Sequence, residues 1–199
     1  MHNKPQTFIF IGRSGSGKGT QIKLLEEYLS SKNLKVKSVV MGDIFRAFFK
    51  ESGYVADIAR DVTTKQGKFQ PDFLTNALFV HNAIHIEDGE SVMFFDGYPR
   101  TSEQLGIIKE LLAYVKRENL IVINIEVARE IVKERMLARG RGDDNEVAIE
   151  SRLNEYDKFI VPMIELIKND SSFKYFEVPG EGKIEDIHTD IINKLGELS

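Results

Sequence analysis

The apolar run Thr7-Phe8-Ile9-Phe10-Ile11 leads directly into Gly12-Arg13-Ser14-Gly15-Ser16-Gly17-Lys18-Gly19-Thr20. An amphipathic pattern follows, with Ile22, Leu25 and Leu29 on one helical face. Backbone N–H groups in a glycine-rich turn that opens a helix can surround a phosphate, and the helix N-terminus adds positive potential. Lys18 can reach the terminal phosphates, and the hydroxyl that usually follows the lysine comes one residue later, at Thr20. The segment therefore predicts a strand, a phosphate-binding loop and a helix.

Five short β-rich runs predict an α/β fold. They span residues 7–11, 35–40, 91–95, 120–127 and 175–178, and several are continuously apolar, which is typical of strands buried on both faces of a parallel sheet. Helical patterns lie between them, which indicates a right-handed, doubly wound arrangement. One such helix is expected to bury Phe73, Ala77, Val80 and Ile84 on one face.

Two segments depart from simple alternation. About fifty residues separate Val40 from Ser91 without a convincing strand, although a crossover needs only about a dozen residues. We expect a small helical subdomain there. Residues 146–168 read as one long helix, and Pro162 inside it predicts a kink or break.

Composition excludes several classes of protein. The 199 residues fit one domain, and 42% hydrophobic residues are too many for a disordered chain. A net charge of -4 argues against duplex nucleic acid as the main partner. No cysteine is present, so disulfides and cysteine-built zinc sites are excluded. The apolar runs are too short for a signal-peptide core or a membrane span, and we expect a cytoplasmic protein.

Five ordered blocks of the sequence resemble the adenylate kinase family of nucleoside monophosphate kinases. They are Gly17-Lys18-Gly19-Thr20-Gln21; Gly42-Asp43-Ile44-Phe45-Arg46 with Gly67-Lys68-Phe69; Asp96-Gly97-Tyr98-Pro99-Arg100-Thr101 with Gln104; Arg135 and Arg139 followed by Arg141-Gly142-Asp143-Asp144 and Arg152; and Gly182 within Val178-Pro179-Gly180-Glu181-Gly182. The resemblance covers nearly the whole chain. It implies a three-layer P-loop fold with a five-stranded parallel sheet, a helical monophosphate-binding insertion and a minimal lid.

The resemblance also implies a division of the chain and a set of site residues. The core would comprise residues 1–41, 74–138 and 145–199, the insertion about 42–73, and the vestigial lid about 139–144. The implied catalytic residues are Lys18, Arg100, Arg139, Arg141 and Arg152. ATP would bind to Gly15, Ser16, Gly17, Lys18, Gly19, Thr20, Arg135, Arg139 and Gly182. AMP would bind to Met41, Arg46, Lys68, Phe69, Gln70, Gly97, Tyr98, Pro99, Arg100, Gln104, Arg141 and Arg152.

The implied reaction is the reversible transfer of a phosphoryl group from ATP to AMP, giving two ADP. Magnesium would accompany ATP, with Asp96 acting on it through water, and no zinc is expected. The partners would be nucleotides only, bound by a monomer. The positions of the arginines agree with this on physical grounds: six of the ten fall in the blocks, and their planar, permanently charged side chains suit phosphate oxygens. Phosphoryl transfer depends chiefly on positioning and charge neutralisation.

Several residues have a structural alternative. Gln104 could complete a capping box that begins at Thr101, or it could hydrogen-bond the acceptor adenine. Asp143 with Glu146 could cap a helix, and Asp43 could stabilise the first turn of a helix. Asp96 could have a structural role in the turn that follows its strand. His81 and His85 have helical metal-pair spacing, but no third ligand is near in sequence.

Two features distinguish this chain from the family pattern. Met41 stands where adenylate kinases usually place a threonine that helps to hold AMP. Pyrimidine-monophosphate kinases usually show an asparagine after the Pro-Arg pair, and Thr101 there favours AMP. Only Gly140 separates Arg139 from Arg141, where relatives carry a mobile lid.

The alternatives in function are a kinase for UMP, CMP or another monophosphate, and a nucleotide-binding module without turnover. A GTPase switch would need Asn-Lys-x-Asp, and neither Asn3-Lys4 nor Asn193-Lys194 is followed by that aspartate.

Overall fold

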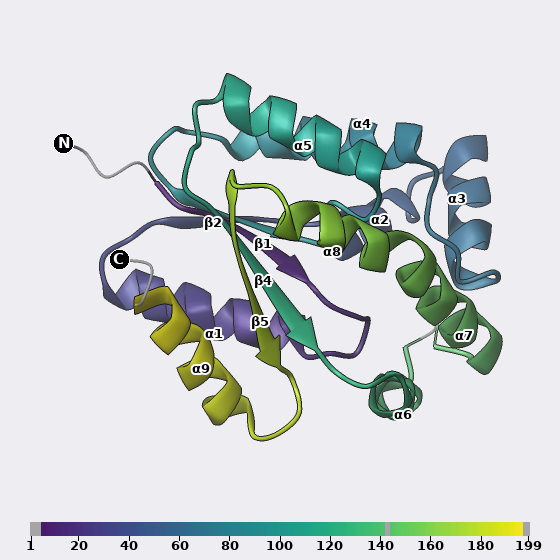
Figure 1. Ribbon diagram of the computed structural model, residues 1–199. Helices are drawn as coiled ribbons and strands as arrows, with labels where there is room; N and C mark the ends of the chain where they lie inside the picture. The colour runs from purple at the N-terminus through teal and green to yellow at the C-terminus, as the bar shows by residue number, and fades with distance from the viewer. Residues whose placement is uncertain (1–4, 142–143, 197–199) are drawn as a thin grey trace.

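The sheet of the protein carries five parallel strands. The computed structural model describes residues 5–141 and 144–196. The strands are β1 (Thr7–Ile11), β2 (Val36–Val40), β3 (Val92–Asp96), β4 (Leu120–Glu126) and β5 (Phe173–Pro179), in the order β2-β3-β1-β4-β5 (Figure 1). All pairs are parallel. The predicted α/β fold is confirmed, and the predicted strands differ from the observed ones by at most one or two residues at an end.

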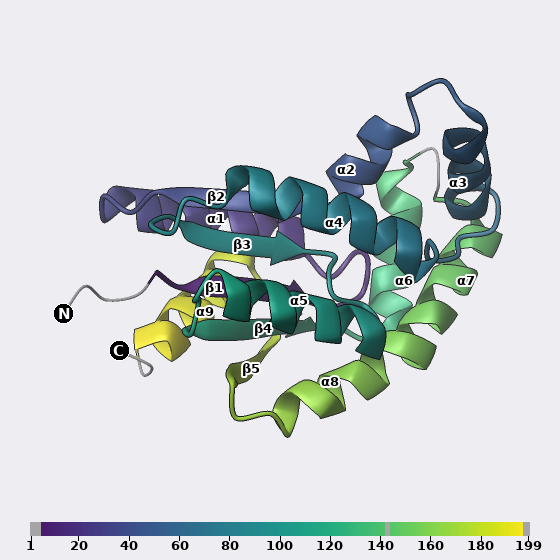
Figure 2. The ribbon, with the colours of Figure 1, turned by 90° about the horizontal axis from the view of Figure 1, so that it is seen from above.

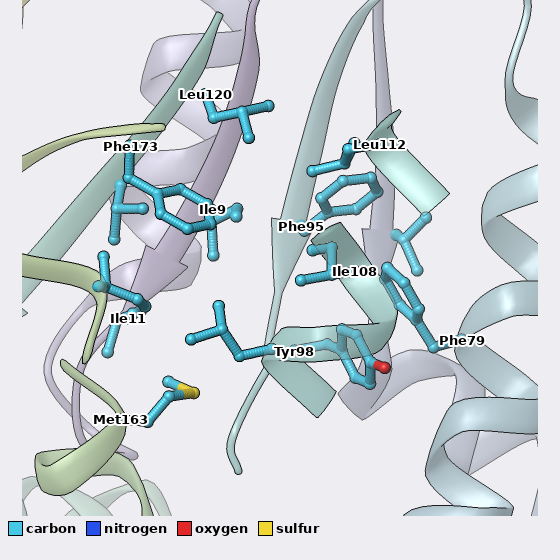
Figure 3. Packing of buried hydrophobic residues seen from close by; sticks show 14 of the residues in the cluster. Ile9, Ile11, Phe79, Phe95, Tyr98, Ile108, Leu112, Leu120, Met163 and Phe173 are labelled. Atoms are coloured by element: carbon cyan, nitrogen blue, oxygen red, sulfur yellow. The ribbon is translucent and has the colours of Figure 1, made fainter. Parts of the chain in front are cut away.

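Helices cover both faces of this sheet and make three layers. They are α1 (Lys18–Ser31), α2 (Met41–Phe48), α3 (Tyr54–Thr64), α4 (Asp72–Ile86), α5 (Ser102–Tyr114), α6 (Arg129–Arg139), α7 (Glu146–Glu155), α8 (Val161–Lys168) and α9 (Ile184–Gly196). Figure 1 shows α1 and α9 on one face of the sheet and α4, α5 and α8 on the other. Successive residues of β1 point to opposite faces. Phe8 and Phe10 therefore pack with α1 and α9, while Ile9 and Ile11 pack towards α4, α5 and α8 (Figure 3).

The buried face of α4 differs from the expected one. Phe73 is 73% exposed and Ile84 is 54% exposed, so the predicted face was wrong. The helix instead buries Thr75, Phe79 and Ala83. Apolar residues lie on more than one side of this helix, so periodicity alone does not select a face. Packing does, because the ring of Phe79 stacks on Tyr98 with 3.7 Å between centroids.

The predicted break near Pro162 is confirmed. α7 ends at Glu155, a π-helical turn spans Tyr156–Ile160, and α8 begins at Val161 with the proline in its first turn. Proline has no N–H and is tolerated at that position, where the N–H would have no helical partner. The turn places Tyr156 and Ile160 in the core and leaves Asp157 exposed.

All five strands point to one end of the molecule, as parallel strands must. The segments that follow β1, β2, β3 and β4 meet there, and Figure 2 shows α3, α6 and α7 gathered at this end. Open α/β sheets bind ligands at the carboxyl ends of their strands. None of the described helices is both long and apolar enough to cross a membrane.

Candidate active site

The predicted phosphate-binding loop lies between the end of β1 and the start of α1. Gly17 is the N-cap residue of α1. Gly12 allows the closest approach in the loop, because a Cβ atom on it would lie 2.5 Å from the carbonyl oxygen of Ile125 on β4. The Oγ atom of Ser16 is buried without a hydrogen-bond partner within the described residues. The Ser16 hydroxyl can therefore hydrogen-bond a ligand that binds at the N-terminus of α1.

Lys18 folds back over this loop. Its Nζ donates hydrogen bonds to the carbonyl oxygens of Gly12 and Arg13, at 2.7 and 3.0 Å. Burial lowers the pKa of Lys18 to about 8; the charge of Asp96 opposes this, and the charges of Arg100 and Arg139 add to it. The ammonium group thus interacts with charged groups from two other predicted blocks, one containing Asp96 and Arg100 and the other Arg139.

Two cavities meet beside the loop. The first is lined by Phe10, Ile11, Gly12, Ser14, Lys18, Phe69, Gly97, Pro99, Arg100, Arg152, Tyr156 and Ile160. The second is lined by Phe45, Phe69, Gln70, Thr75, Gly97, Arg100 and Gln104. Phe69, Gly97 and Arg100 border both, so a ligand in one cavity would lie next to a ligand in the other.

Arg100 is the cation at this junction. Its guanidinium lies over the ring of Phe69, with 4.7 Å from Cζ to the ring centroid. Burial lowers the pKa of Arg100, the charge of Asp96 opposes this, and the like charge of Arg152 adds to it. Among the residues that the structure describes, no carboxylate forms an ion pair with Arg100. A half-buried guanidinium without such a partner favours an anionic ligand.

A second group of arginines converges on Asp144, between α6 and α7. Arg139 donates to its carboxylate from Nε and Nη2, both at 2.9 Å, and Arg152 donates from Nη1 at 3.3 Å. The backbone N–H of Arg141 donates to the same carboxylate at 3.2 Å. The Asp144 side chain is fully buried, and although burial alone would raise its pKa, these hydrogen bonds and charges lower it.

The structure brings together many of the residues predicted for the site. Those that line the cavities are Lys18, Phe69, Gln70, Gly97, Pro99, Arg100, Gln104 and Arg152. The loop residues Gly15, Ser16, Gly17, Gly19 and Thr20 adjoin Lys18 in the chain. Asp96 ends β3, where it pairs in register with Phe10 of β1.

Other predicted residues do not line the two cavities. Met41 is buried in the core at the start of α2, and Arg46 is exposed and paired with Asp43. Tyr98 is buried, with its hydroxyl donating to Asn76. Arg135 donates to the carbonyl oxygen of Gly180. Lys68 and Gly182 are exposed.

The structure bears on three of the structural alternatives: the two helix caps and the histidine pair. Thr101 is the N-cap of α5 and its Oγ1 accepts from the backbone N–H of Gln104, so that half of the predicted capping box is confirmed. The other half is not formed, because the side-chain amide of Gln104 bonds to Arg100 and Asp72 and not to the backbone N–H of Thr101. α7 is capped by Asn145, whose Oδ1 accepts from Ala148; Asp143 lies outside the described residues. Within residues 5–141 and 144–196, no three His, Asp or Glu side chains gather into a metal site.

Sequence reasoning missed an ion network behind the phosphate loop. Arg13 donates to Glu126 at 2.5 Å and to Asp157 at 2.9 Å, and its guanidinium lies over the ring of Tyr156. Asp157 also accepts from Arg129. No pattern in the chain could have indicated these contacts, because Arg13 is 113 and 144 positions from its partners.

Comparisons with known proteins agree with this geometry. The family model for adenylate kinase matches residues 10–172. The chain is 38% identical to an adenylate kinase of Corynebacterium diphtheriae, over 94% of this chain and 98% of that protein. It is 34% identical to one of Bifidobacterium longum, again over 94% and 98%. The phosphate loop, the arginines and these similarities agree: the chain belongs to the adenylate kinase family of nucleoside monophosphate kinases.

Proposed function

We propose that the first cavity binds the phosphates of ATP, that the second binds AMP, and that the protein interconverts ATP and AMP with two ADP. The observation that carries the proposal is the position of Arg100. Its guanidinium borders both cavities and lacks a carboxylate partner among the described residues. A cation at this place can hold the acceptor phosphate and also face the phosphoryl group in transfer.

The chemistry is an in-line displacement. An oxygen of the AMP phosphate attacks the terminal phosphorus of ATP, the bond from that phosphorus to the bridging oxygen breaks, and ADP leaves. Lys18 and the loop amides hold the donor phosphates, while Arg139, Arg141 and Arg152 neutralise the charge in transfer. Such fixed cations stabilise the transition state without having to reorganise during the reaction.

The bases would bind at either side of this centre. Arg135 and Gly182 lie near the end of β5 and would contact the adenine of ATP, with Gly15, Ser16, Gly17, Gly19 and Thr20 around its phosphates. Lys68, Phe69, Gln70, Gly97, Tyr98, Pro99 and Gln104 would surround AMP, with Met41 and Arg46 at the start of the insertion. The chemistry of Gln104 supports this, because its amide can both donate to and accept from an adenine edge.

Asp96 is suited to a magnesium ion that ATP brings with it. Magnesium retains several waters and is usually bound through one or two carboxylates and substrate phosphates. A single carboxylate near Lys18 fits that set of ligands. A magnesium site formed only by protein side chains would need additional oxygen ligands. When bound, the ion would neutralise phosphate charge. A chelator should stop turnover and leave the Tm of the nucleotide-free protein unchanged; a lower Tm would indicate a structural metal instead.

We propose the same division of the chain as the sequence suggested: a core of residues 1–41, 74–138 and 145–199, an AMP-binding insertion of 42–73 and a minimal lid of 139–144. α6 ends at Arg139 and α7 begins at Glu146, which supports a short lid. We further propose a cytoplasmic monomer whose partners are nucleotides. One chain supplies every residue that lines the two cavities, so the proposed site does not require a second subunit.

A coupled assay with ATP, magnesium and a panel of monophosphates tests the function. AMP should give the highest kcat/KM. Lys18→Met and Arg100→Met should each lower kcat by roughly 10²–10³-fold, the size of effect known for losing one transition-state donor. Lys109→Met is the matched control, because Lys109 is exposed and pairs with Asp170 on the surface. Better turnover with CMP or UMP, or more than a tenth of wild-type kcat in either site variant, would contradict the proposal.

A further inference from the structure

The side-chain amide of Gln104 is held at both of its ends. Its Oε1 accepts a hydrogen bond from the backbone N–H of Arg100 at 2.8 Å. Its Nε2 donates to Oδ1 of Asp72 at 2.6 Å. Gln104 is only 2% exposed and lines the second cavity. Each amide atom still has one hydrogen-bonding position left, because the nitrogen carries two hydrogens and the oxygen two lone pairs.

The two anchors permit one orientation of the amide. A backbone N–H can only donate, and an ionised carboxylate can only accept. Turning the amide by 180° would place its NH₂ against the Arg100 N–H and its oxygen against the Asp72 carboxylate, so both bonds would be lost. Asp72 is itself held, because Thr101 Oγ1 donates to its two oxygens at 3.2 and 3.1 Å.

The orientation matters for the choice of base. The six-membered edge of adenine presents a donor, the 6-amino group, beside an acceptor, N1. Hypoxanthine and guanine present the reverse, an acceptor at O6 beside a donor at N1–H. A glutamine that turns freely can match either edge, because rotation exchanges its donor and acceptor. For a base held in one orientation by its ribose phosphate, a glutamine fixed in one orientation matches only one of the two edges.

We propose that Asp72 is a positioning residue for specificity: by fixing the amide of Gln104, it makes the acceptor site select a 6-aminopurine monophosphate over a 6-oxopurine monophosphate. The inference rests on the proposed function, since it requires the second cavity to bind the acceptor base. Asp72 does not touch the acceptor in this scheme and acts only through Gln104. Its position at the start of α4, bonded to the N-cap residue of α5, ties both helices to this one amide.

The experiment measures kcat/KM for AMP and for IMP, whose bases differ at position 6, in the wild type and four variants. Asp72→Asn keeps the size of the side chain but can donate as well as accept, so it no longer fixes the amide. We expect the AMP-to-IMP ratio to fall by about tenfold or more, as for the loss of a hydrogen bond to a charged group. KM should rise for AMP and fall for IMP, with a smaller change in kcat.

Two further variants make the result decisive. Glu103→Gln is the matched control, because it removes a first-turn carboxylate from α5 next to Gln104 without touching the amide, and its ratio should stay at the wild-type value. Asp72→Ser keeps a residue suited to a helix start and serves if Asp72→Asn does not fold. An equal loss with AMP and IMP in the Asp72 variants would show a merely structural role and overturn the inference.

Gln104→Leu separates this inference from the proposed function. It should abolish most of the preference for AMP over IMP. If it leaves the ratio unchanged, Gln104 does not read the base, and both the proposed acceptor site and the inference fail. If Gln104→Leu changes the ratio but the Asp72 variants do not, the acceptor site stands and the role of Asp72 is overturned.

Discussion

A Cβ atom on Gly67 would lie 2.2 Å from the carbonyl oxygen of Ala148, so the turn after α3 packs its backbone directly against α7. Nearby, the backbone N–H of Phe69 donates to Glu155 Oε2 at 3.3 Å. α7 carries Arg152, and Phe69 supports the guanidinium of Arg100. The contact therefore connects the proposed AMP-binding insertion with the arginines of the proposed reaction centre.

Gly67→Ala should disrupt this contact. Gly67 has a φ of +64°, a conformation that costs a residue with a Cβ about 1–2 kcal/mol even without a clash. The added methyl would also push the turn away from α7, so the free energy of unfolding should fall by more than that amount. KM for AMP should rise more than KM for ATP. Urea unfolding and steady-state kinetics measure both effects.

The matched control is Gly89→Ala. Gly89 has a φ of +74°, and an added Cβ would meet no atom within 4 Å. It should show the cost of the backbone conformation alone and leave both KM values unchanged. Equal effects of the two substitutions would mean that the contact with α7 does not matter.

The low pKa of Lys18 predicts the pH dependence of ATP capture. In the free protein, burial lowers this pKa to about 8, so the ammonium group is charged below that pH and neutral above it. Only the charged form attracts the donor phosphates. The kcat/KM for ATP reports groups of the free enzyme and should fall above about pH 8. Bound phosphates favour the charged form, so the fall in kcat should come at higher pH.

Lys18→Arg provides the control for this titration. A guanidinium keeps its charge throughout the accessible range of pH. The variant should therefore lose the alkaline fall in kcat/KM for ATP, whatever its absolute activity. If wild type and variant show the same fall near pH 8, another group is responsible for it.

The sequence predicted the elements that local residue patterns specify, such as a helix break at a proline. It also predicted strands that are buried on both faces of the sheet. Short β-rich runs, several of them continuously apolar, located the five strands, and Pro162 located the break before α8. The face of α4 could not be predicted, because the stacking of Phe79 on Tyr98 joins residues that are far apart in the chain. Arg100 and Arg152, which line the cavities, could be named from the sequence because they lie in recognisable blocks.

The supporting residues of the site were not predictable. Asp72 contacts Gln104 across 32 positions, and Arg13 reaches Asp157 across 144. Each is an ordinary charged residue in sequence, with nothing to distinguish it from a surface charge. Only the fold determines which of them meets a partner.

The ion pair between Arg117 and Glu87 should contribute to stability without affecting catalysis. Arg117 donates to the two Glu87 oxygens at 2.7 and 2.8 Å, and its side chain is 1% exposed. It also reaches Gln6 and Ser91, at the end of the sheet opposite the active site. Glu87→Gln would leave this buried cation unpaired, and we expect unfolding free energy at pH 7 to fall by about 3–5 kcal/mol.

The pH dependence of the unfolding free energy shows whether the loss in Glu87→Gln comes from the ion pair with Arg117. Burial alone would raise the pKa of Glu87, but hydrogen bonds from Arg117 and the backbone of Gly89 lower it. The stabilisation is thus present above the unfolded-state pKa of about 4.3 and is lost as the pH falls towards the lower folded value. The difference between wild type and variant should shrink below about pH 4, while kcat at pH 7 stays unchanged. Lys109→Gln, which breaks an exposed pair, should cost less than about 1 kcal/mol.

We expect Asp144 to supply, in the nucleotide-free protein, the negative charge that bound nucleotide supplies to the same arginines. Its buried carboxylate holds Arg139 and Arg152 together, two cations that would otherwise repel. Asp144→Asn should lower the Tm of the nucleotide-free protein. A ligand that joins ATP to AMP supplies several negative charges to the same arginines, so a saturating amount should raise the Tm of the variant more than that of the wild type.

Glu165→Gln is the control for Asp144→Asn, since Glu165 forms an exposed pair with Lys168 within α8. Glu165→Gln should change the Tm of the nucleotide-free protein only slightly, and it should leave the rise in Tm on ligand binding at the wild-type value. Thermal unfolding with and without the bisubstrate ligand compares each of the two variants with the wild type, both in Tm and in the shift of Tm on binding. If Asp144 instead only holds the arginines in position for phosphate, its loss would weaken ligand binding and make the thermal shift smaller than in the wild type. The sign of that difference therefore decides between a carboxylate that stands in for the substrate and one that supports it.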